Sequence, residues 1–232
     1  MKTIGLIGGM SWESTLVYYK LINEGIKDRL GGLHSAKIIL HSVDFAPIAK
    51  MQEEGRWDEA SIELTRIALS LEKAGADFIV VCTNTMHKIV PFITPYITIP
   101  VIHIAKATAQ HLNALDIKNV LLLGTKFTMK EPFYREILHA HGIEVHIPEA
   151  DEIEKINAII FNELCVGKIE TSSNEYMNSL IKHYQKIHPS LDGIILGCTE
   201  LGLLLKDEEI DIPLFDTTVV HANCAIQKAI ED

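Results

Sequence analysis

K-T-I-G-L-I-G-G (residues 2–9) opens the chain with a short apolar run that ends in glycine, and K-N-V-L-L-L-G-T (residues 118–125) repeats this pattern in the second half. The two runs lie 118 − 2 = 116 residues apart in a chain of 232 residues, which is half its length. Cys82 and Cys198, each at the end of another apolar run, are separated by the same 198 − 82 = 116 residues. This shared offset predicts two similar halves related by a pseudo-two-fold axis.

Apolar runs alternate with segments of helical character along both halves. The runs are continuously apolar, as expected of parallel strands that are covered on both faces. We predict strands at residues 3–7, 36–42, 78–81, 101–102, 120–123, 144–147, 193–196 and 214–215. Helices are predicted at residues 14–28, 57–74, 132–141, 152–164 and 174–187. Strands and helices in alternation favour an α/β fold with two parallel sheets.

No run of Gly, Ser or Pro separates the halves, so we expect two closely packed domains with a ligand cleft between them. Pro100 and Pro213 precede corresponding short strands and mark candidate crossings between the domains. We therefore predict an N-terminal domain of residues 1–101, onto which residues 213–232 pack back, and a C-terminal domain of residues 102–212.

The charge balance and the cysteine content narrow the class of protein. Lys plus Arg number 21 against 31 for Asp plus Glu, a net charge of −10, so no nucleic-acid partner is expected. No segment resembles a signal peptide or a membrane-spanning helix, so we expect a cytoplasmic protein without a membrane partner. The four cysteines include no C-x-x-C pair and are predicted to be free thiols. No Cys/His set has zinc spacing, and no metal is expected.

The two cysteines that share the offset lie where ligands bind in open α/β sheets. C-T-N-T-M-H (residues 82–87) and G-C-T-E (residues 197–200) each place a cysteine directly after a buried strand, at its carboxyl end. Each precedes a predicted helix start, whose N–H groups and positive end would lower the pKa of the thiol and bind a carboxylate. Cysteine is also a common small core residue, and Cys165 and Cys224 keep that interpretation.

Two thiols that face each other suit a reaction that inverts a stereocentre. One thiolate removes a proton from one face of a carbon, while the opposite thiol delivers a proton to the other face. General acid and base groups work best when their pKa lies near the working pH, which a tuned thiol can reach. Helix N-termini and hydroxyl groups can stabilise the charge that develops.

Four motifs in this order resemble the aspartate/glutamate racemase family: G-L-I-G-G-M-S-W-E-S-T (residues 5–15), C-T-N-T-M-H, L-G-T-K-F-T-M (residues 123–129) and G-C-T-E. Within it, the broad-specificity amino-acid racemases related to aspartate racemase are most similar. The resemblance implies two four-stranded parallel domains with the active site between them, and a homodimer whose partner is a small-molecule amino-acid substrate. It implies catalysis without pyridoxal phosphate, metal or any other cofactor.

The resemblance also assigns roles to residues of this chain. Cys82 and Cys198 match the acid/base pair. The residues implied to bind substrate are Met10, Gln52, Thr83, Asn84, Thr85, Thr125, Thr199 and Glu200. Of these, Glu200 would orient the second thiol or assist its deprotonation. Glutamate racemases carry Asp-Ser and a histidine where this chain has Met10-Ser11 and Glu200, which weakens a strict glutamate reading. Gln52 would suit neutral or mixed side chains.

Three alternatives stay open. A maleate isomerase-like enzyme also keeps two cysteines, and a hydantoin racemase-like enzyme shares the fold. A decarboxylase of this superfamily uses one cysteine and is disfavoured. The alternative from another class is a non-catalytic amino-acid binding protein on the same scaffold. The sequence leaves open the preferred amino acid, the oligomeric state and the enantiomer that each cysteine handles.

Overall fold

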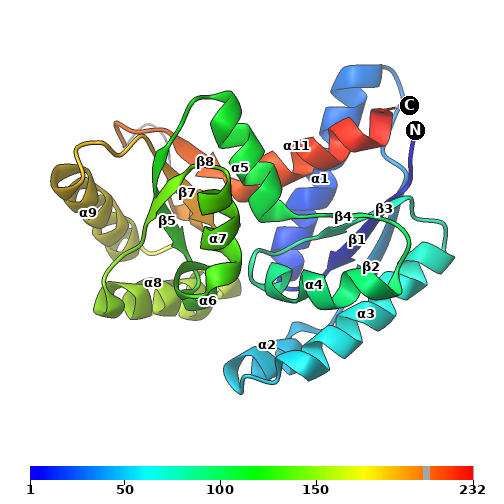
Figure 1. Cartoon of the computed structure of the whole chain (residues 1–232), viewed down its shortest axis with the longest axis horizontal. Coiled ribbons are helices and arrows are strands. Elements are labelled where there is room, and N and C mark those ends of the chain that lie inside the picture. The colour runs from blue at the N-terminus through cyan, green and yellow to red at the C-terminus, as the bar shows by residue number, and fades with distance from the viewer. Residues whose placement is uncertain (206–209, 232) are drawn as a thin grey trace. The chain divides into compact units, whose positions relative to one another are not determined.

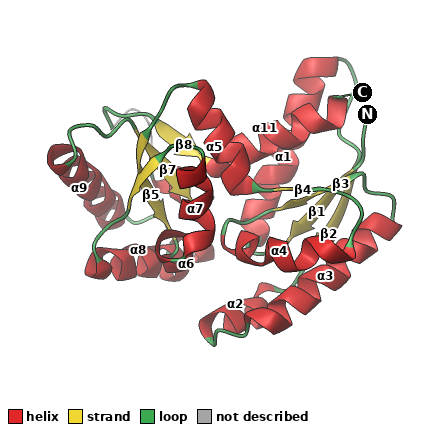
Figure 2. Cartoon of the chain, in the orientation of Figure 1, coloured by secondary structure: helices red, strands yellow, loops and turns green. Residues whose placement is uncertain are grey.

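The protein is described by a computed structural model that covers residues 1–205 and 210–231. It divides into two compact units, Met1–Ile104 together with the C-terminal stretch from Thr218, and Ala105–Thr217. Each unit contains a four-stranded parallel sheet with helices on both of its faces (Figures 1 and 2). The predicted α/β fold of two similar parallel-sheet domains is confirmed.

The first unit is built on the strand order β2-β1-β3-β4. Its strands are β1 (Ile4–Gly8), β2 (Ile38–Ser42), β3 (Phe78–Val81) and β4 (Val101–Ile102). Its helical segments are α1 (Trp12–Leu30), α2 (Phe45–Glu53), α3 (Trp57–Lys73), the 3-10 turn η1 (Thr85–Ile89), α4 (Val90–Ile93), the 3-10 turn η2 (Thr94–Tyr96) and α11 (Thr217–Ile230). All three strand pairs are parallel, so their carboxyl ends share one edge of the sheet.

Alternation along β1 explains why this sheet is covered on both faces. Ile4 and Leu6 are fully buried in a cluster with Tyr18 of α1, whereas Ile7 points to the other face and packs with Leu64 of α3. Figure 1 shows α1 and α11 on one face and α3 on the other. The start and the end of the described chain lie side by side in this unit, where Lys2 N–H donates to Ala229 O at 2.8 Å.

The second unit repeats the arrangement with the strand order β6-β5-β7-β8. Its strands are β5 (Asn119–Gly124), β6 (Glu144–His146), β7 (Gly193–Gly197) and β8 (Leu214–Asp216). Its helical segments are α5 (Ile104–Ala114), α6 (Lys126–Lys130), α7 (Pro132–Ala140), α8 (Ala150–Asn162), the 3-10 turn η3 (Leu164–Val166), α9 (Thr171–Ile187) and α10 (Leu201–Leu204). β7 therefore holds the same place in this sheet that β3 holds in the first.

The eight predicted strands are all present, with ends shifted by two residues at most. Helices α5 and α6 lie outside the predicted helices, and so does α2. Helix α2 begins after Asp44, whose side chain accepts from Ala46 N–H at 3.2 Å, and Pro47 lies in its first turn, where a missing N–H leaves no hydrogen bond unmade.

The crossings between units follow from strand pairing. The predicted ranges assigned residues 213–217 to the first domain, but β8 pairs with β7 and so belongs to the second sheet. The chain enters the second unit after Ile104 and leaves it after Thr217. The predicted ranges also include residues 206–209 and 232, which lie outside the described residues.

Gly9 shapes the turn that follows β1. It has φ of +91°, and its N–H donates to Thr15 Oγ1 at 2.8 Å. A Cβ at this position would clash with the backbone of Val43. We expect Gly9→Ala to lower the free energy of unfolding by about 2–4 kcal/mol, because backbone strain and overpacking add. Urea denaturation measures the loss.

Gly167→Ala is the matched control for this prediction. Gly167 is left-handed, with φ of +74° and ψ of 17°, but a Cβ there would meet no atom within 4 Å. Only the backbone strain remains, so a loss of about 1 kcal/mol is expected. Equal losses in the two variants would contradict the close approach of Gly9 to Val43.

Candidate active site

Cys82 lies directly beyond the carboxyl end of β3, between strand β1 and the start of helix α1. Its N–H donates to Ile7 O at 2.9 Å, and its carbonyl oxygen accepts from Ser14 Oγ at 3.1 Å. Its side chain is fully buried in the cluster that contains Tyr18 and Ile102. The main chain at Cys82 is therefore fixed by β1 on one side and by α1 on the other.

The residues after Cys82 form a tight turn that leads into η1. Thr83 is partly exposed, whereas Asn84 and Thr85 are buried. Thr83 N–H donates to Val81 O at 2.9 Å, and His87 N–H donates to Asn84 O at 3.0 Å. The predicted helix start at Thr85 is thus confirmed in place, but the helix is a single short 3-10 segment before α4.

Met10 and Gln52 lie in the same unit as this turn, and they are linked to it by an apolar cluster and by a hydrogen bond, respectively. Gln52 is buried on α2, and its Nε2 donates to Met86 Sδ at 2.9 Å. Met10 is buried in the same apolar cluster as Met86. The structure therefore brings Gln52 into contact with the C-T-N-T-M-H stretch and places Met10 in an apolar cluster that includes part of it.

Cys198 follows β7 as Cys82 follows β3. Its Sγ donates to Glu200 Oε2 at 3.0 Å, and Glu200 is 5% exposed. Thr199 between them is buried as well. The two-residue spacing of the motif thus places a carboxylate directly against the thiol.

Cys165 also contacts this carboxylate, which the sequence did not predict. Its Sγ lies 3.9 Å from Glu200 Oε1, so the two oxygens of Glu200 face two different thiols. Cys165 lies in η3, more than 30 residues before Glu200 in the chain. No local pattern links them, because the contact arises only when η3 packs beside the end of β7.

Thr125 lies beside Cys198 in the second unit. Gly124 of β5 pairs with Gly197 of β7, so Thr125 and Cys198 are the next residues on adjacent strands. Thr125 caps α6, because its Oγ1 accepts from Thr128 N–H at 3.3 Å. Within each unit, the predicted residues therefore gather at the carboxyl end of its sheet.

The pKa values of both thiols are raised, whereas the sequence predicted that they would be lowered. Burial raises the pKa of Cys82, and burial, followed by the charge of Glu200 and the neighbouring Cys165, raises the pKa of Cys198. The prediction that helix N-termini would lower the pKa values of the two thiols is therefore wrong. η1 and α10 are only one short turn each, so desolvation outweighs their dipoles.

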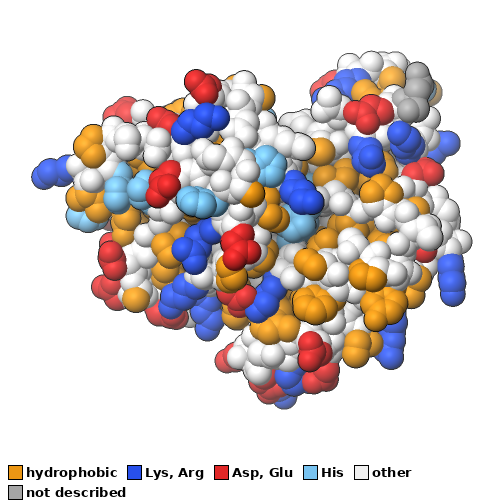
Figure 3. Space-filling model, viewed as in Figure 1, with side chains coloured by type: hydrophobic (Ala, Val, Ile, Leu, Met, Phe, Trp, Pro, Cys, Tyr) orange, Lys and Arg blue, Asp and Glu red, His pale blue; other side chains and the backbone are white. Residues whose placement is uncertain are grey.

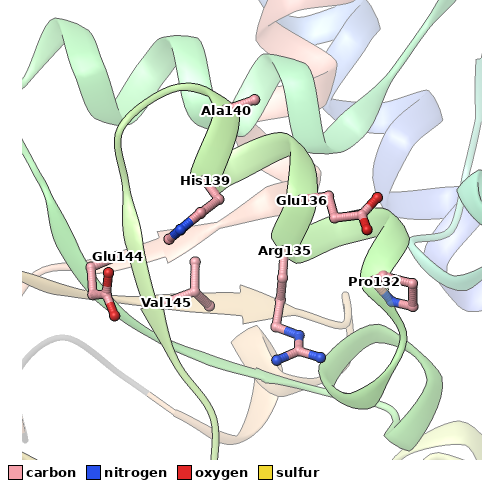
Figure 4. A pocket seen from close by; sticks show the side chains of 7 residues that line it. All are labelled: Pro132, Arg135, Glu136, His139, Ala140, Glu144 and Val145. Atoms are coloured by element: carbon pink, nitrogen blue, oxygen red, sulfur yellow. The ribbon is translucent and has the colours of Figure 1, made fainter.

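A cavity of about 510 Å³ in the second unit does not coincide with these residues. Figure 4 shows it between α7 and β6, and it is lined by Pro132, Arg135, Glu136, His139, Ala140, Glu144 and Val145. None of the predicted site residues lines it. Within residues 1–205 and 210–231, no group of His, Cys, Asp and Glu side chains could hold a metal ion, and no helix is long and apolar enough to cross a membrane.

A family model described as Asp/Glu/Hydantoin racemase matches residues 7–225. The chain belongs to the Asp/Glu/Hydantoin racemase family. The resemblance seen in its four motifs is confirmed, and as a member of a racemase family the chain is an isomerase. The match includes the 82–87 stretch, the 197–200 stretch and the strands that precede them.

Curated members of the Asp/Glu/Hydantoin racemase family align with most of the chain. The broad specificity amino-acid racemase RacX of Bacillus subtilis (strain 168) is 26% identical over 174 residues, which cover 73% of this chain and 72% of that relative. A glutamate racemase of Actinobacillus pleuropneumoniae serotype 5b (strain L20) is 26% identical over 172 residues. That alignment covers 73% of this chain but 61% of the relative, less than two thirds of its length.

Two crystal structures of this family match the chain over its whole length. A proposed Asp/Glu racemase from Yersinia pestis has 47% identity and a TM-score of 0.92, with 100% of both chains covered. An aspartate racemase homologue from Pyrococcus horikoshii OT3 has 35% identity and a TM-score of 0.86, again over 100% of both chains. The racemase fold therefore extends from the first strand to the last helix of this protein.

Proposed function

We propose that this protein is a cofactor-independent amino-acid racemase of broad side-chain specificity. In this proposal Cys82 and Cys198 remove and deliver the α-proton on opposite faces of the substrate. The observation that carries it is the equivalence of the two thiols: each directly follows the matching strand, β3 or β7, of two sheets with the same strand order.

The contact between Cys198 and Glu200 supplies a route to a thiolate. Both thiols are protonated at neutral pH, because burial raises their pKa values. Transfer of the Cys198 proton to Glu200 Oε2, along a 3.0 Å hydrogen bond, forms a thiolate without changing the net charge of the pair. Burial makes the formation of an additional charge unfavourable. This transfer is less unfavourable, because it moves one negative charge from Glu200 to Cys198 and creates none.

The proton inventory of one turnover then balances. The Cys198 thiolate takes the α-proton and becomes a thiol, and the substrate becomes a carbanion. The Cys82 thiol gives its proton to the other face of the carbanion and becomes a thiolate. The reverse substrate starts from this state, with a Cys82 thiolate and a Cys198 thiol, and uses the two groups in exchanged roles. Otherwise Cys82 takes a proton from solvent and Glu200 releases its proton to solvent, which restores the starting state. Donors on Thr83, Asn84, Thr85, Thr125 and Thr199 are proposed to hold the substrate carboxylate and amino group.

Side-chain recognition is proposed to be permissive. The amide of Gln52 is neutral and accepts as well as donates hydrogen bonds, so it does not select for a second carboxylate as an arginine would. The name of the Bacillus subtilis relative, a broad specificity amino-acid racemase, supports the same proposal. The preferred amino acid stays open.

A homodimer and a cytoplasmic location complete the proposal. Figure 3 shows hydrophobic side chains gathered over α4 and the adjoining part of α3, and Phe92 and Tyr96 of this region are 57% and 67% exposed. Exposed apolar patches commonly mark protein interfaces. All four cysteines are free, which suits a reducing compartment.

Proton exchange with solvent tests the proposed reaction. Single enantiomers of a panel of amino acids are incubated with the protein in heavy water, and the α-proton is followed by NMR while chiral chromatography follows inversion. We expect deuterium at the α-carbon together with formation of the other enantiomer. Binding without exchange would instead support an amino-acid binding protein, and turnover of maleate alone would support a maleate isomerase.

A further inference from the structure

We infer that His87 is a positioning residue for proton transfer at Cys82, acting through the carbonyl group of Thr83. The inference rests on the proposed function and concerns only the first unit. His87 closes the C-T-N-T-M-H stretch and is not among the residues proposed to bind the substrate or to transfer its proton.

The imidazole of His87 holds the turn that follows Cys82. Its Nδ1 lies 2.8 Å from Thr83 O, and because a carbonyl oxygen only accepts, Nδ1 carries the proton. The His87 N–H also donates to Asn84 O at 3.0 Å. One residue therefore fixes two consecutive carbonyl groups, and both belong to residues proposed to hold the substrate.

Burial keeps this donor in one protonation state. His87 is fully buried, and burial lowers its pKa to about 4 against smaller opposing contributions from nearby backbone groups. The ring is neutral at neutral pH, so the Nδ1 proton is fixed and Nε2 carries a lone pair. Nε2 is buried and has no hydrogen-bond partner among the described residues. An apolar ring at this position would not bury an acceptor without a hydrogen bond. The advantage of the imidazole is therefore its hydrogen bond to Thr83 O.

Neighbouring side chains hold the ring itself. The ring of His221 lies 5.4 Å from that of His87, centroid to centroid, and the ring of His103 lies 4.8 Å away. His221 is anchored twice, because its Nε2–H donates to Ile102 O at 2.9 Å and its Nδ1 accepts from the Tyr18 hydroxyl at 2.8 Å. His87 therefore packs against a side chain that is held by α1, β4 and α11.

The hydrogen bonds from Ser14 and His87 are made to the carbonyl groups of two consecutive residues. Ser14 Oγ donates to Cys82 O at 3.1 Å, and His87 donates to Thr83 O. Together they fix the backbone on the carboxyl side of Cys82 and hence the direction of its thiol. Proton transfer requires near-contact geometry, and a misplacement of about 1 Å can lower a rate by about 10²-fold.

The effect of His87 should fall on one enantiomer. Each enantiomer loses its α-proton to a different thiol, so a disturbance at Cys82 slows exchange from the enantiomer that Cys82 deprotonates. The overall kcat/KM for the two directions stays linked by the equilibrium between enantiomers and would hide this bias. Initial rates of α-proton exchange in heavy water, measured separately on each enantiomer, reveal it.

Two variants separate the donor from the packing, since Leu keeps nearly the volume of His and Asn keeps the donor. His87→Leu removes the donor, whereas in His87→Asn the side-chain amide can donate to Thr83 O from nearly the place of Nδ1. We expect His87→Leu to slow exchange of the enantiomer handled by Cys82 by about tenfold or more, and the other enantiomer by less than about twofold. His87→Asn should recover most of the loss. Cys82→Ala identifies which enantiomer is meant.

His141→Leu is the matched control. His141 Nδ1 bonds to Ile137 O, four residues earlier, at 2.7 Å, which is the same local contact in the second unit. It should leave both exchange rates unchanged. Equal slowing of both enantiomers by His87→Leu, or equal rates for His87→Leu and His87→Asn, would overturn the inference. If the unaltered protein exchanges neither enantiomer, the proposed function fails instead, and the two failures are therefore distinct.

Discussion

Cys82→Ala and Cys198→Ala should each lower kcat for racemisation by about 10²–10⁴-fold, the range that a positioned acid or base contributes. Each variant removes one of two groups that must act in the same turnover, so neither loss can be covered by the remaining thiol. Chiral chromatography of the product formed from a single enantiomer measures the effect. Both variants should bind the substrate, because the hydroxyl and amide groups around each thiol remain.

The two variants should differ in proton exchange. Cys82→Ala keeps Cys198 and should still exchange the α-proton of one enantiomer with retention of configuration. Cys198→Ala should do so for the other enantiomer. Opposite bias in the two variants is the signature of two thiols on two faces, and a general loss of folding cannot produce it.

Cys224→Ala is the control for removal of a thiol. Cys224 is partly buried in α11 of the first unit, and it packs against the same apolar cluster that contains Cys82. This variant should keep full activity. Any change in its stability measures the effect of removing a thiol from the cluster. If Cys82→Ala or Cys198→Ala kept more than about a tenth of the activity, the two-thiol mechanism would be wrong.

The fold was predictable because its central strands can be recognised from their own residues. A central parallel strand such as β1 or β7 is buried on both faces, so every residue in it is apolar or glycine and the run stands out. The internal repeat predicted that the two halves would have similar folds. The position of β8 was less visible, because a three-residue strand has too few side chains to indicate which sheet it joins.

The candidate site was only partly predictable. Cys82 and Cys198 follow strands, and local sequence places them. Cys165 meets Glu200 only through tertiary packing, so no spacing rule could find it. The direction of the thiol pKa was missed for a related reason: sequence locates a helix start but not the burial around it, and burial has the larger effect here.

Glu200→Gln should separate two effects that one carboxylate exerts on Cys198. As a neighbouring negative charge, Glu200 opposes the thiolate and contributes to the raised pKa of Cys198, after burial. As a hydrogen-bond acceptor at 3.0 Å, it can take the thiol proton. Glutamine keeps the shape and an acceptor oxygen but removes both the charge and the basicity.

The two effects predict opposite signs in one variant. Without the charge, the pKa of Cys198 falls, so at a pH below that pKa the thiolate fraction rises and alkylation by iodoacetamide becomes faster. Without the base, the coupled transfer is lost, and we expect kcat to fall by about 10²-fold. Peptide mass spectrometry follows alkylation of Cys198 across a pH series, and chiral chromatography follows kcat.

Glu163→Gln provides the matched control, since Glu163 is a partly buried carboxylate of the same unit that accepts from Ser173 Oγ at 2.6 Å. It should change neither the alkylation of Cys198 nor kcat by more than about twofold. A Glu200→Gln variant with faster alkylation and undiminished kcat would show that the carboxylate only repels the thiolate. Slower alkylation together with lower kcat would point to collapse of the loop, so only the combination of a more reactive thiol and a slower enzyme supports Glu200 as the proton acceptor.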